Sequence, residues 1–180
     1  LCILLLGSCA PVQNQEDLLH GALRVSERNP RYFTDDSGKA VYLTGSHTWN
    51  NLVDVSSADS PEGFDFVRYL QWLKGYNHNF IRLWAWELIN WNTPGHIYEV
   101  KDYQVAPQPW ARSGKGTALD GKPKFDLSQF NPVYFDRLKE RVEQAADEGI
   151  YVSIMLFEGW GLQFATRAFE NHPFHPDNNI

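Results

Sequence analysis

The stretch Asn79-Phe80-Ile81-Arg82-Leu83-Trp84-Ala85-Trp86-Glu87 decides how the rest of the chain can fold. It is an apolar run that predicts a buried strand, but it holds an arginine in its middle and ends in a carboxylate. Burying an unpaired guanidinium is costly, so Arg82 should have an anionic partner or a polar cavity to point into. A structural ion pair, or an arginine that reaches solvent from a strand end, is the simpler alternative. The strand is therefore a candidate wall of an active site.

Two amphipathic helices are predicted, one on each side of this strand. Ser60-Pro61 has the residues of a helix N-cap and first turn, and Gly75 stands where a helix-ending glycine belongs. Asn131-Pro132 and Gly149 delimit the second helix in the same way. Apolar residues recur at helical spacing inside both segments.

Further strands are predicted on both sides of the helices. Residues 150–157 form a nearly continuous apolar run, as a parallel strand covered on both faces requires. Residues 41–46 form another apolar run, which gives way to polar and aromatic residues at 47–51. The turn residues 35–39 lie between two apolar arms and predict a β-hairpin, and residues 23–25 predict a short strand before it.

The order of these elements predicts a mixed α/β fold with a parallel sheet, since strands alternate with amphipathic helices. Residues 88–130 look like one long irregular stretch, and a loop of that length is usually functional or disordered. No Gly-rich phosphate loop follows a predicted strand, so a dinucleotide-binding sheet is less favoured than a (β/α)8 barrel. A barrel takes about 250 residues. We therefore expect the N-terminal portion of a TIM barrel, about three βα units, preceded by a β-hairpin.

Composition places the chain among globular proteins. Its 180 residues are 43% hydrophobic and 21% charged, with 14% aromatic residues and seven tryptophans. The formal net charge of −6 argues against nucleic acid as a partner, because no basic face is visible. Tryptophans near loops suggest recognition of a ligand with a flat apolar face.

The N-terminus resembles the end of a bacterial lipoprotein signal peptide. Residues 1–9 are an apolar run followed by small residues and Cys9, the candidate lipidation site. Residues 10–22 are expected to be a polar tether, and 23–180 an incomplete catalytic-type domain. A simple secretory signal or a buried N-terminal strand are the alternatives. The expected location is outside the cell, as a cell-surface or periplasmic lipoprotein or a secreted protein, with membrane contact only through the lipid on Cys9.

Four segments together resemble the N-terminal part of cellulase-like glycoside hydrolases, (β/α)8 enzymes of the clan that includes glycoside hydrolase family 5. These segments are 29–35, 42–51, 79–84 and 151–160. The resemblance covers about residues 23–180. Where the family often has a histidine at the end of the third strand, this chain has Phe157 followed by Glu158.

The resemblance implies hydrolysis of O-glycosidic bonds in a polysaccharide or oligosaccharide by a retaining, two-carboxylate mechanism. It places the acid/base and nucleophilic glutamates after the fourth and seventh strands, beyond residue 180, so this fragment alone should be inactive. It gives Arg82 the role of supporting the nucleophile. No cofactor is implied. The alternative is a carbohydrate-binding surface lipoprotein with the same fold and no catalytic carboxylates.

Several side chains at predicted strand ends are candidate sugar contacts. A pyranose has polar edges and an apolar face, so hydrogen-bonding groups beside an aromatic ring suit it. Barrel-rim packing and core filling are the structural alternatives for each of them. The candidates are His47, Trp49, Asn50, Trp84, Trp86, Glu87, Trp91, Trp110, Glu158 and Trp160.

Glu87 and Glu158 would be a tempting catalytic pair from the residues alone, because adjacent strands could bring their carboxyl groups close. The resemblance places the catalytic pair elsewhere, so both are interpreted as acceptors for sugar hydroxyls or partners of Arg82, with a solvated loop carboxylate as the alternative. His172 and His175 have a metal-like spacing, but each precedes a proline and no further ligand set is apparent. No metal site is expected.

Overall fold

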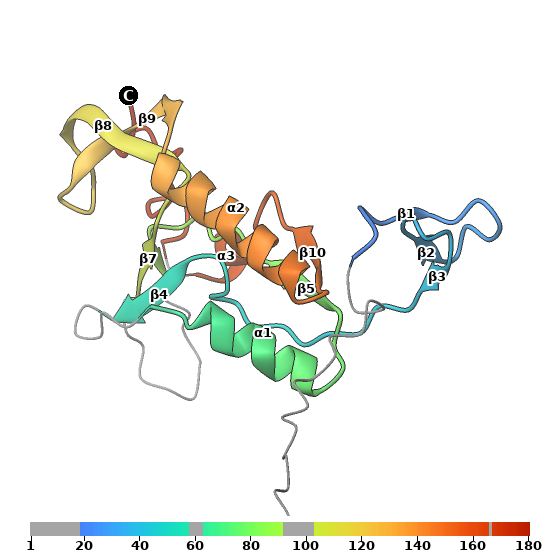
Figure 1. Cartoon of the computed structure of the whole chain (residues 1–180). Coiled ribbons are helices and arrows are strands. Elements are labelled where there is room, and N and C mark those ends of the chain that lie inside the picture. The colour runs from blue at the N-terminus through green and yellow to red at the C-terminus, as the bar shows by residue number, and fades with distance from the viewer. Residues whose placement is uncertain (1–18, 58–62, 92–102, 166) are drawn as a thin grey trace, which may run out of the picture.

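The computed structural model describes residues 19–57, 63–91, 103–165 and 167–180, without the side chains of Ser57 and Trp91. These residues form a mixed α/β structure of short strands and few helices, as Figure 1 shows. The elements are β1 (Arg24–Val25), β2 (Phe33–Thr34), β3 (Ala40–Val41), β4 (Asp54–Ser57), α1 (Phe66–Gly75), β5 (Phe80–Leu83), β6 (Asn90–Trp91), β7 (Tyr103–Ala106), β8 (Trp110–Thr117), β9 (Pro123–Phe130), α2 (Pro132–Asp147), β10 (Tyr151–Ile154) and α3 (Trp160–Phe164).

A parallel pair, β5 and β10, stands at the centre of the molecule. Their register runs from Tyr151 opposite Phe80 to Ile154 opposite Leu83, which confirms the parallel relation predicted for these two strands. Both are shorter than the sequence predicted. At the end of β5 the side chain of Asn51 satisfies two backbone groups. Its amide donates to Arg82 O, and its oxygen accepts from Trp84 N.

The strand predicted at residues 41–46 is wrong. Residues 42–48 are not a strand, although they lie beside the start of β5. The side chain of Asn79 accounts for this, because it donates to Tyr42 O and accepts from Thr44 N in place of a regular ladder. The two backbones approach closely at Gly45, where a Cβ atom would lie 2.0 Å from Phe80 O. Only glycine fits there. A (β/α)8 barrel piece is therefore not confirmed.

Helix α1 starts later than predicted. Its N-cap is Asp65, whose carboxylate accepts from Arg68 N at 3.0 Å, and Gly63 to Asp65 are not helical. Ser60-Pro61 lies outside the described residues. Gly75 is the last helical residue, and the left-handed conformation after the helix belongs to Asn77, with φ 57°. Asparagine tolerates that conformation better than most residues.

Helix α2 has the predicted ends. The side chain of Asn131 accepts from Val133 N, Pro132 occupies the first turn, and Gly149 follows with φ 74°. Its buried face differs from the prediction, because Arg141 is buried while Phe135 is exposed. The guanidinium of Arg141 lies 4.8 Å from the ring centroid of Phe66 on α1, a cation–π contact between the two helices.

Residues 88–130 are not one irregular stretch, which corrects the prediction. They hold β6, β7 and the hairpin β8–β9, and β7 pairs antiparallel with both β4 and β6. The high glycine content obscured the hairpin in the sequence. At Gly114 a Cβ atom would lie 2.9 Å from Lys124 O, so this glycine allows the two arms to approach.

The predicted N-terminal hairpin is confirmed, and β1 adds a third strand to it. This small sheet stands apart from the two large helices in Figure 1. Asp35 joins it to the centre, because its buried carboxylate accepts from the Tyr151 hydroxyl of β10 at 2.6 Å and from Ser37 N at 2.9 Å. Burial opposes ionisation, but these hydrogen bonds outweigh it and hold the pKa of Asp35 well below its usual value.

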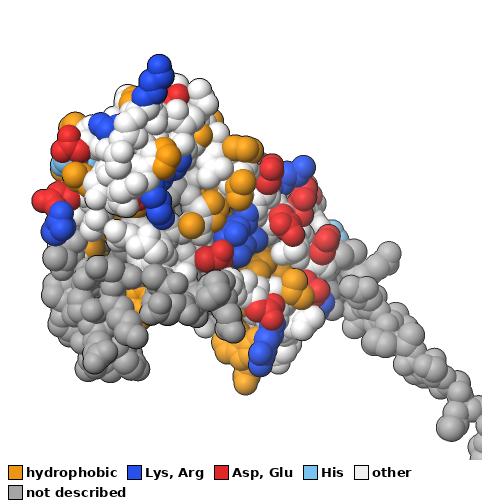
Figure 2. All heavy atoms as spheres, turned by 90° about the vertical axis from the view of Figure 1, so that its left-hand side faces the viewer, with side chains coloured by type: hydrophobic (Ala, Val, Ile, Leu, Met, Phe, Trp, Pro, Cys, Tyr) orange, Lys and Arg blue, Asp and Glu red, His pale blue; other side chains and the backbone are white. Residues whose placement is uncertain are grey.

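The apolar core lies between α1, α2 and the parallel pair. It gathers buried side chains from α1, α2, β5 and β7 and from the segments before β4, after β5 and before β10: Leu52, Val53, Phe66, Leu70, Leu73, Ile81, Leu83, Trp86, Val105, Tyr134, Ala145 and Ile150. Outside this core some apolar side chains stay exposed, among them Leu156 and Phe157 after β10. On the face drawn in Figure 2, acidic and basic side chains are interspersed, with apolar ones between them.

Candidate functional site

A cavity of about 430 Å³ lies where the chain leaves the parallel pair, between residues 47–50 and the β4–β7 sheet. Trp86 reaches it from the segment after β5. Its wall consists of His47, Thr48, Trp49, Asn50, Val55, Trp86 and Tyr103. Four of these residues, His47, Trp49, Asn50 and Trp86, are among the contacts predicted from the sequence.

The aromatic side of the site is a cluster of four tryptophans. The Trp49 ring centroid lies 6.1 Å from Trp84, 6.3 Å from Trp86 and 5.6 Å from Trp160. Trp86 is buried and its indole N–H donates to Trp49 O at 2.7 Å, which fixes residue 49 against the core. Trp49 itself is 41% exposed. The cluster therefore presents one aromatic face to solvent on a rigid base.

His47 is a polar group in the same wall. Its ring stacks on Trp84, with centroids 5.1 Å apart and an interplanar angle of 27°. Partial burial and the positive charge of Arg82 lower the pKa of His47. The imidazole is therefore neutral at pH 7, with one donor and one acceptor nitrogen.

Arg82 has no buried anionic partner among the described residues and reaches solvent, which was the simpler alternative for it. Its side chain is exposed, while Ile81 and Leu83 on either side are buried, because alternate residues of β5 face opposite ways. No acidic side chain forms a salt bridge with it in the part of the chain that the structure describes. Its predicted role beside a nucleophile is untested by this structure.

Glu87 and Glu158 lie together, as the parallel strands predicted, but both are buried. Glu87 accepts from the backbone N–H of Glu158 at 3.2 Å, and Glu158 accepts from Gly161 N at 2.5 Å. Glu158 is only 1% exposed, and its second oxygen has no hydrogen-bond partner in the described structure. Neither carboxylate lines the cavity. A sugar hydroxyl has no access to them in this arrangement.

The carboxyl pair has a third neighbour in His172, which is also buried. His172 Nε2 lies 3.8 Å from Glu87 Oε2, and its Nδ1 accepts from Phe174 N. Because Nδ1 is an acceptor, a neutral His172 carries its proton on Nε2, facing Glu87. Burial and the charge of Glu87 raise the pKa of Glu158 above its usual value.

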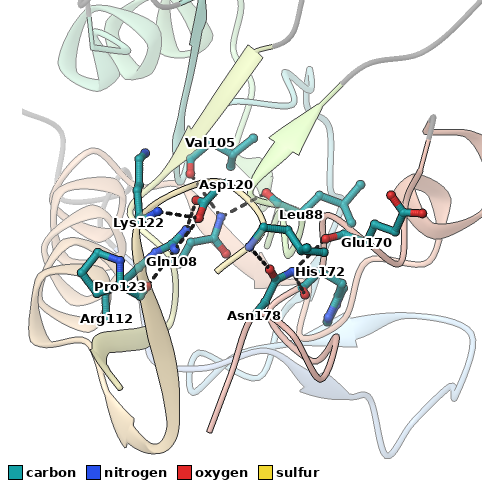
Figure 3. A network of polar contacts seen from close by, with 11 residues as sticks. Leu88, Val105, Gln108, Arg112, Asp120, Lys122, Pro123, Glu170, His172 and Asn178 are labelled. Carbon is teal, nitrogen blue, oxygen red and sulfur yellow. Dashed lines mark hydrogen bonds and ion pairs between the residues drawn. The ribbon is translucent and has the colours of Figure 1, made fainter. Parts of the chain in front are cut away.

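A polar network fixes the C-terminal segment that carries His172 (Figure 3). The Asn178 amide donates to Glu170 O and His172 O, and its oxygen accepts from Leu119 N. Within the hairpin, Arg112 pairs with Asp120 and also donates to Pro123 O. The Gln108 amide donates to Leu88 O and Val105 O, next to Glu87. The backbone next to Glu87 is thus held by Gln108, and the backbone of His172 is held by Asn178.

The remaining predicted contacts lie elsewhere. Trp110 packs on Phe174, 4.8 Å between centroids, and is not part of the cavity wall. The side chain of Trp91 and the segment that contains Cys9 lie outside the described residues. Sequence reasoning did not assign Thr48, Val55 or Tyr103 to the site. Tyr103 carried a signal, as an aromatic residue in a segment otherwise rich in turn formers.

No group of three or more His, Cys, Asp or Glu side chains among the described residues could hold a metal ion. Among the same residues, no helix has the length and apolar character needed to cross a membrane.

Comparisons with known proteins give two matches. Residues 103–180 match a family model described as "Domain of unknown function (DUF6298)". One solved structure, of a "putative glycoside hydrolase" from Bacteroides vulgatus, matches with 20% identity and a TM-score of 0.47 over 77% of this chain and 24% of that one. The chain thus spans about a quarter of that protein's length. No curated protein matches the sequence.

Proposed function

We propose that the cavity at residues 47–50 binds a sugar unit of a polysaccharide or oligosaccharide. The observation that carries this proposal is the exposed face of Trp49 beside His47 and Asn50 in one wall. An aromatic face suits the apolar face of a pyranose, and the neighbouring donors and acceptors suit its hydroxyl groups. The indole N–H of Trp86 holds the backbone of Trp49 in place, so the wall should lose little conformational entropy when a ligand binds.

The reaction that we propose for the full-length protein is retaining hydrolysis of O-glycosidic bonds. Such chemistry needs two carboxyl groups about 5–5.5 Å apart on either side of the scissile bond. The resemblance to cellulase-like glycoside hydrolases implies an acid/base and a nucleophile beyond residue 180, and the buried pair Glu87 and Glu158 is not assigned to these roles. Arg82, exposed on β5, is free to support that nucleophile.

A second candidate function is carbohydrate binding without catalysis. The cavity wall favours it, because none of the described residues that form it carries a carboxylate. Both functions place sugar in the same cavity. They differ in whether Arg82 contributes to turnover.

Affinity electrophoresis in gels containing cellulose derivatives, xylan, mannan or laminarin tests the shared part of the proposal. We expect at least one glycan to retard the wild-type protein, and Trp49→Ala to weaken that binding about tenfold, or 1.4 kcal/mol. The conservative Trp49→Phe should keep most of the affinity. Tyr32→Ala, an exposed aromatic residue on the N-terminal sheet, is the matched control.

Arg82→Ala in the full-length protein separates the two functions. An enzyme should lose most of its kcat with little change in glycan affinity, whereas a binder shows no turnover to lose. If no glycan retards the wild-type protein, or if Trp49→Ala binds as tightly as Tyr32→Ala, the sugar site is wrong.

A further inference from the structure

A second hollow, of about 600 Å³, lies beside the cavity along the N-terminal half of α1. Thr48 and Asn50 line both hollows, so these two residues form a common wall. Thr48 donates its hydroxyl to Asn50 Oδ1 at 3.1 Å. The wall between the hollows is therefore polar, and the amide hydrogens of Asn50 point away from that bond.

The floor of the second hollow is aromatic. Tyr69 is fixed by its hydroxyl, which donates to Ser46 O at 2.7 Å. Trp72 lies one turn further along α1 with its ring nearly parallel to that of Tyr69, at 13° and 6.5 Å. Trp72 is 46% exposed, although it belongs to a helix whose buried side chains are Phe66, Leu70 and Leu73.

The rim of this hollow is charged. Asp65 and Arg68 line it beside the aromatic rings. The Asp65 carboxylate caps α1, whereas the Arg68 side chain forms no salt bridge with any described residue. Arg68 and Trp72 thus place guanidinium donors and an indole ring in one hollow, and the first cavity likewise combines hydrogen-bonding groups with an indole ring.

We propose that the second hollow is a distal sugar subsite and that the ligand is a chain of more than two sugar units. The chain would pass over the wall of Thr48 and Asn50, with one unit against Trp49 and another against Trp72. Both hollows fall in the range of about 300–1,000 Å³ typical of small-molecule sites. This inference depends on the proposed function, because it extends the same ligand.

The test compares short and long ligands of one glycan. Isothermal titration would measure the disaccharide and the hexasaccharide of whichever glycan retards the wild-type protein. Trp72→Ala should weaken hexasaccharide binding about tenfold and leave disaccharide binding unchanged, whereas Trp49→Ala should weaken both. Trp72→Phe should retain most of the hexasaccharide affinity, and Tyr32→Ala should behave as wild type.

The outcomes separate the two proposals. If Trp49→Ala weakens binding but Trp72→Ala binds both lengths like wild type, the distal subsite is wrong and the sugar cavity stands. Equal loss for both lengths in Trp72→Ala also overturns the subsite, provided that the circular dichroism of Trp72→Ala matches that of the wild-type protein, which shows that the fold is not the cause. If no glycan binds at all, both proposals fail.

Discussion

At the scale of single residues, the Glu158 carboxylate is expected to lower the stability of the fold when it is ionised. It is buried beside Glu87, and one of its oxygens has no hydrogen-bond partner in the described structure. We expect Glu158→Gln to raise the free energy of unfolding by about 1 kcal/mol at pH 7, because the amide removes a buried charge and still accepts from Gly161 N. Urea denaturation measures this change.

The gain should depend on pH. The pKa of Glu158 is raised on folding, so its ionisation opposes folding at neutral pH and the opposition disappears as pH falls toward the ordinary value of 4.5. The difference between Glu158→Gln and wild type should shrink accordingly between pH 7 and pH 4. Glu27→Gln, at an exposed position, is the control and should change stability little. A destabilised Glu158→Gln would mean that the carboxylate is well satisfied.

At the scale of elements, α2 is held at its N-terminus by one residue. Asn131 caps the helix through its side-chain oxygen, and its amide donates to Gln108 O at 2.9 Å. Asn131→Ala should therefore cost about 1–2 kcal/mol of unfolding free energy. Asn131→Asp keeps the cap and loses only the amide donor, so it should cost less. Thermal and urea denaturation of both variants give the comparison.

Gln144→Ala is the matched control for this helix. Its side chain bonds only to Glu140 on the exposed face, and we expect a change within about 0.5 kcal/mol. Equal effects of Asn131→Ala and Gln144→Ala would show that the cap contributes nothing.

At the scale of the whole molecule, the N-terminal sheet β1–β3 depends on the contact between Asp35 and Tyr151. Tyr151→Phe removes one donor from a buried carboxylate, a loss of about 1.5–3 kcal/mol for a charged hydrogen bond. We expect amide hydrogen exchange in β1–β3 to become at least tenfold faster, while exchange in β5 and α2 changes little. Hydrogen-exchange mass spectrometry resolves these segments.

Tyr42→Phe serves as control for Tyr151→Phe, because Tyr42 is exposed and its backbone bonds to Asn79, next to β5, the strand that pairs with β10. A uniform rise in exchange over the whole chain would mean that Tyr151 acts on the core and not on the attachment of the sheet.

Sequence reasoning predicted the elements whose signals are local. The ends of α2 follow from Asn131 and Gly149, and the apolar runs around Ile81 and Val152 predicted the parallel pair. It placed the start of α1 too early because two good caps compete, and Asp65 stands directly before the apolar residues that the core buries. It failed for residues 88–130 because pairing of strands far apart in the chain has no local pattern.

The part of the candidate site that could be predicted from the sequence is the part that is contiguous in the chain. His47, Trp49 and Asn50 follow one apolar run, so their neighbourhood could be inferred from the chain order. Val55 and Tyr103 enter the wall through the antiparallel pairing of β4 with β7, which the sequence does not indicate. The burial of Glu158 depends likewise on distant residues such as His172, which lies in the segment held by Asn178.

The tryptophan cluster gives the protein its own optical reporter. Indole rings with centroids 5.6–6.3 Å apart share excitation energy, so Trp49, Trp84, Trp86 and Trp160 absorb and emit as a coupled group and should produce strong near-ultraviolet ellipticity. Trp49 is the most exposed of the four, since Trp84 and Trp160 are half-buried and Trp86 is buried. A molecule seated on Trp49 changes the emission of the whole group, so that occupancy can be followed by fluorescence without any attached label.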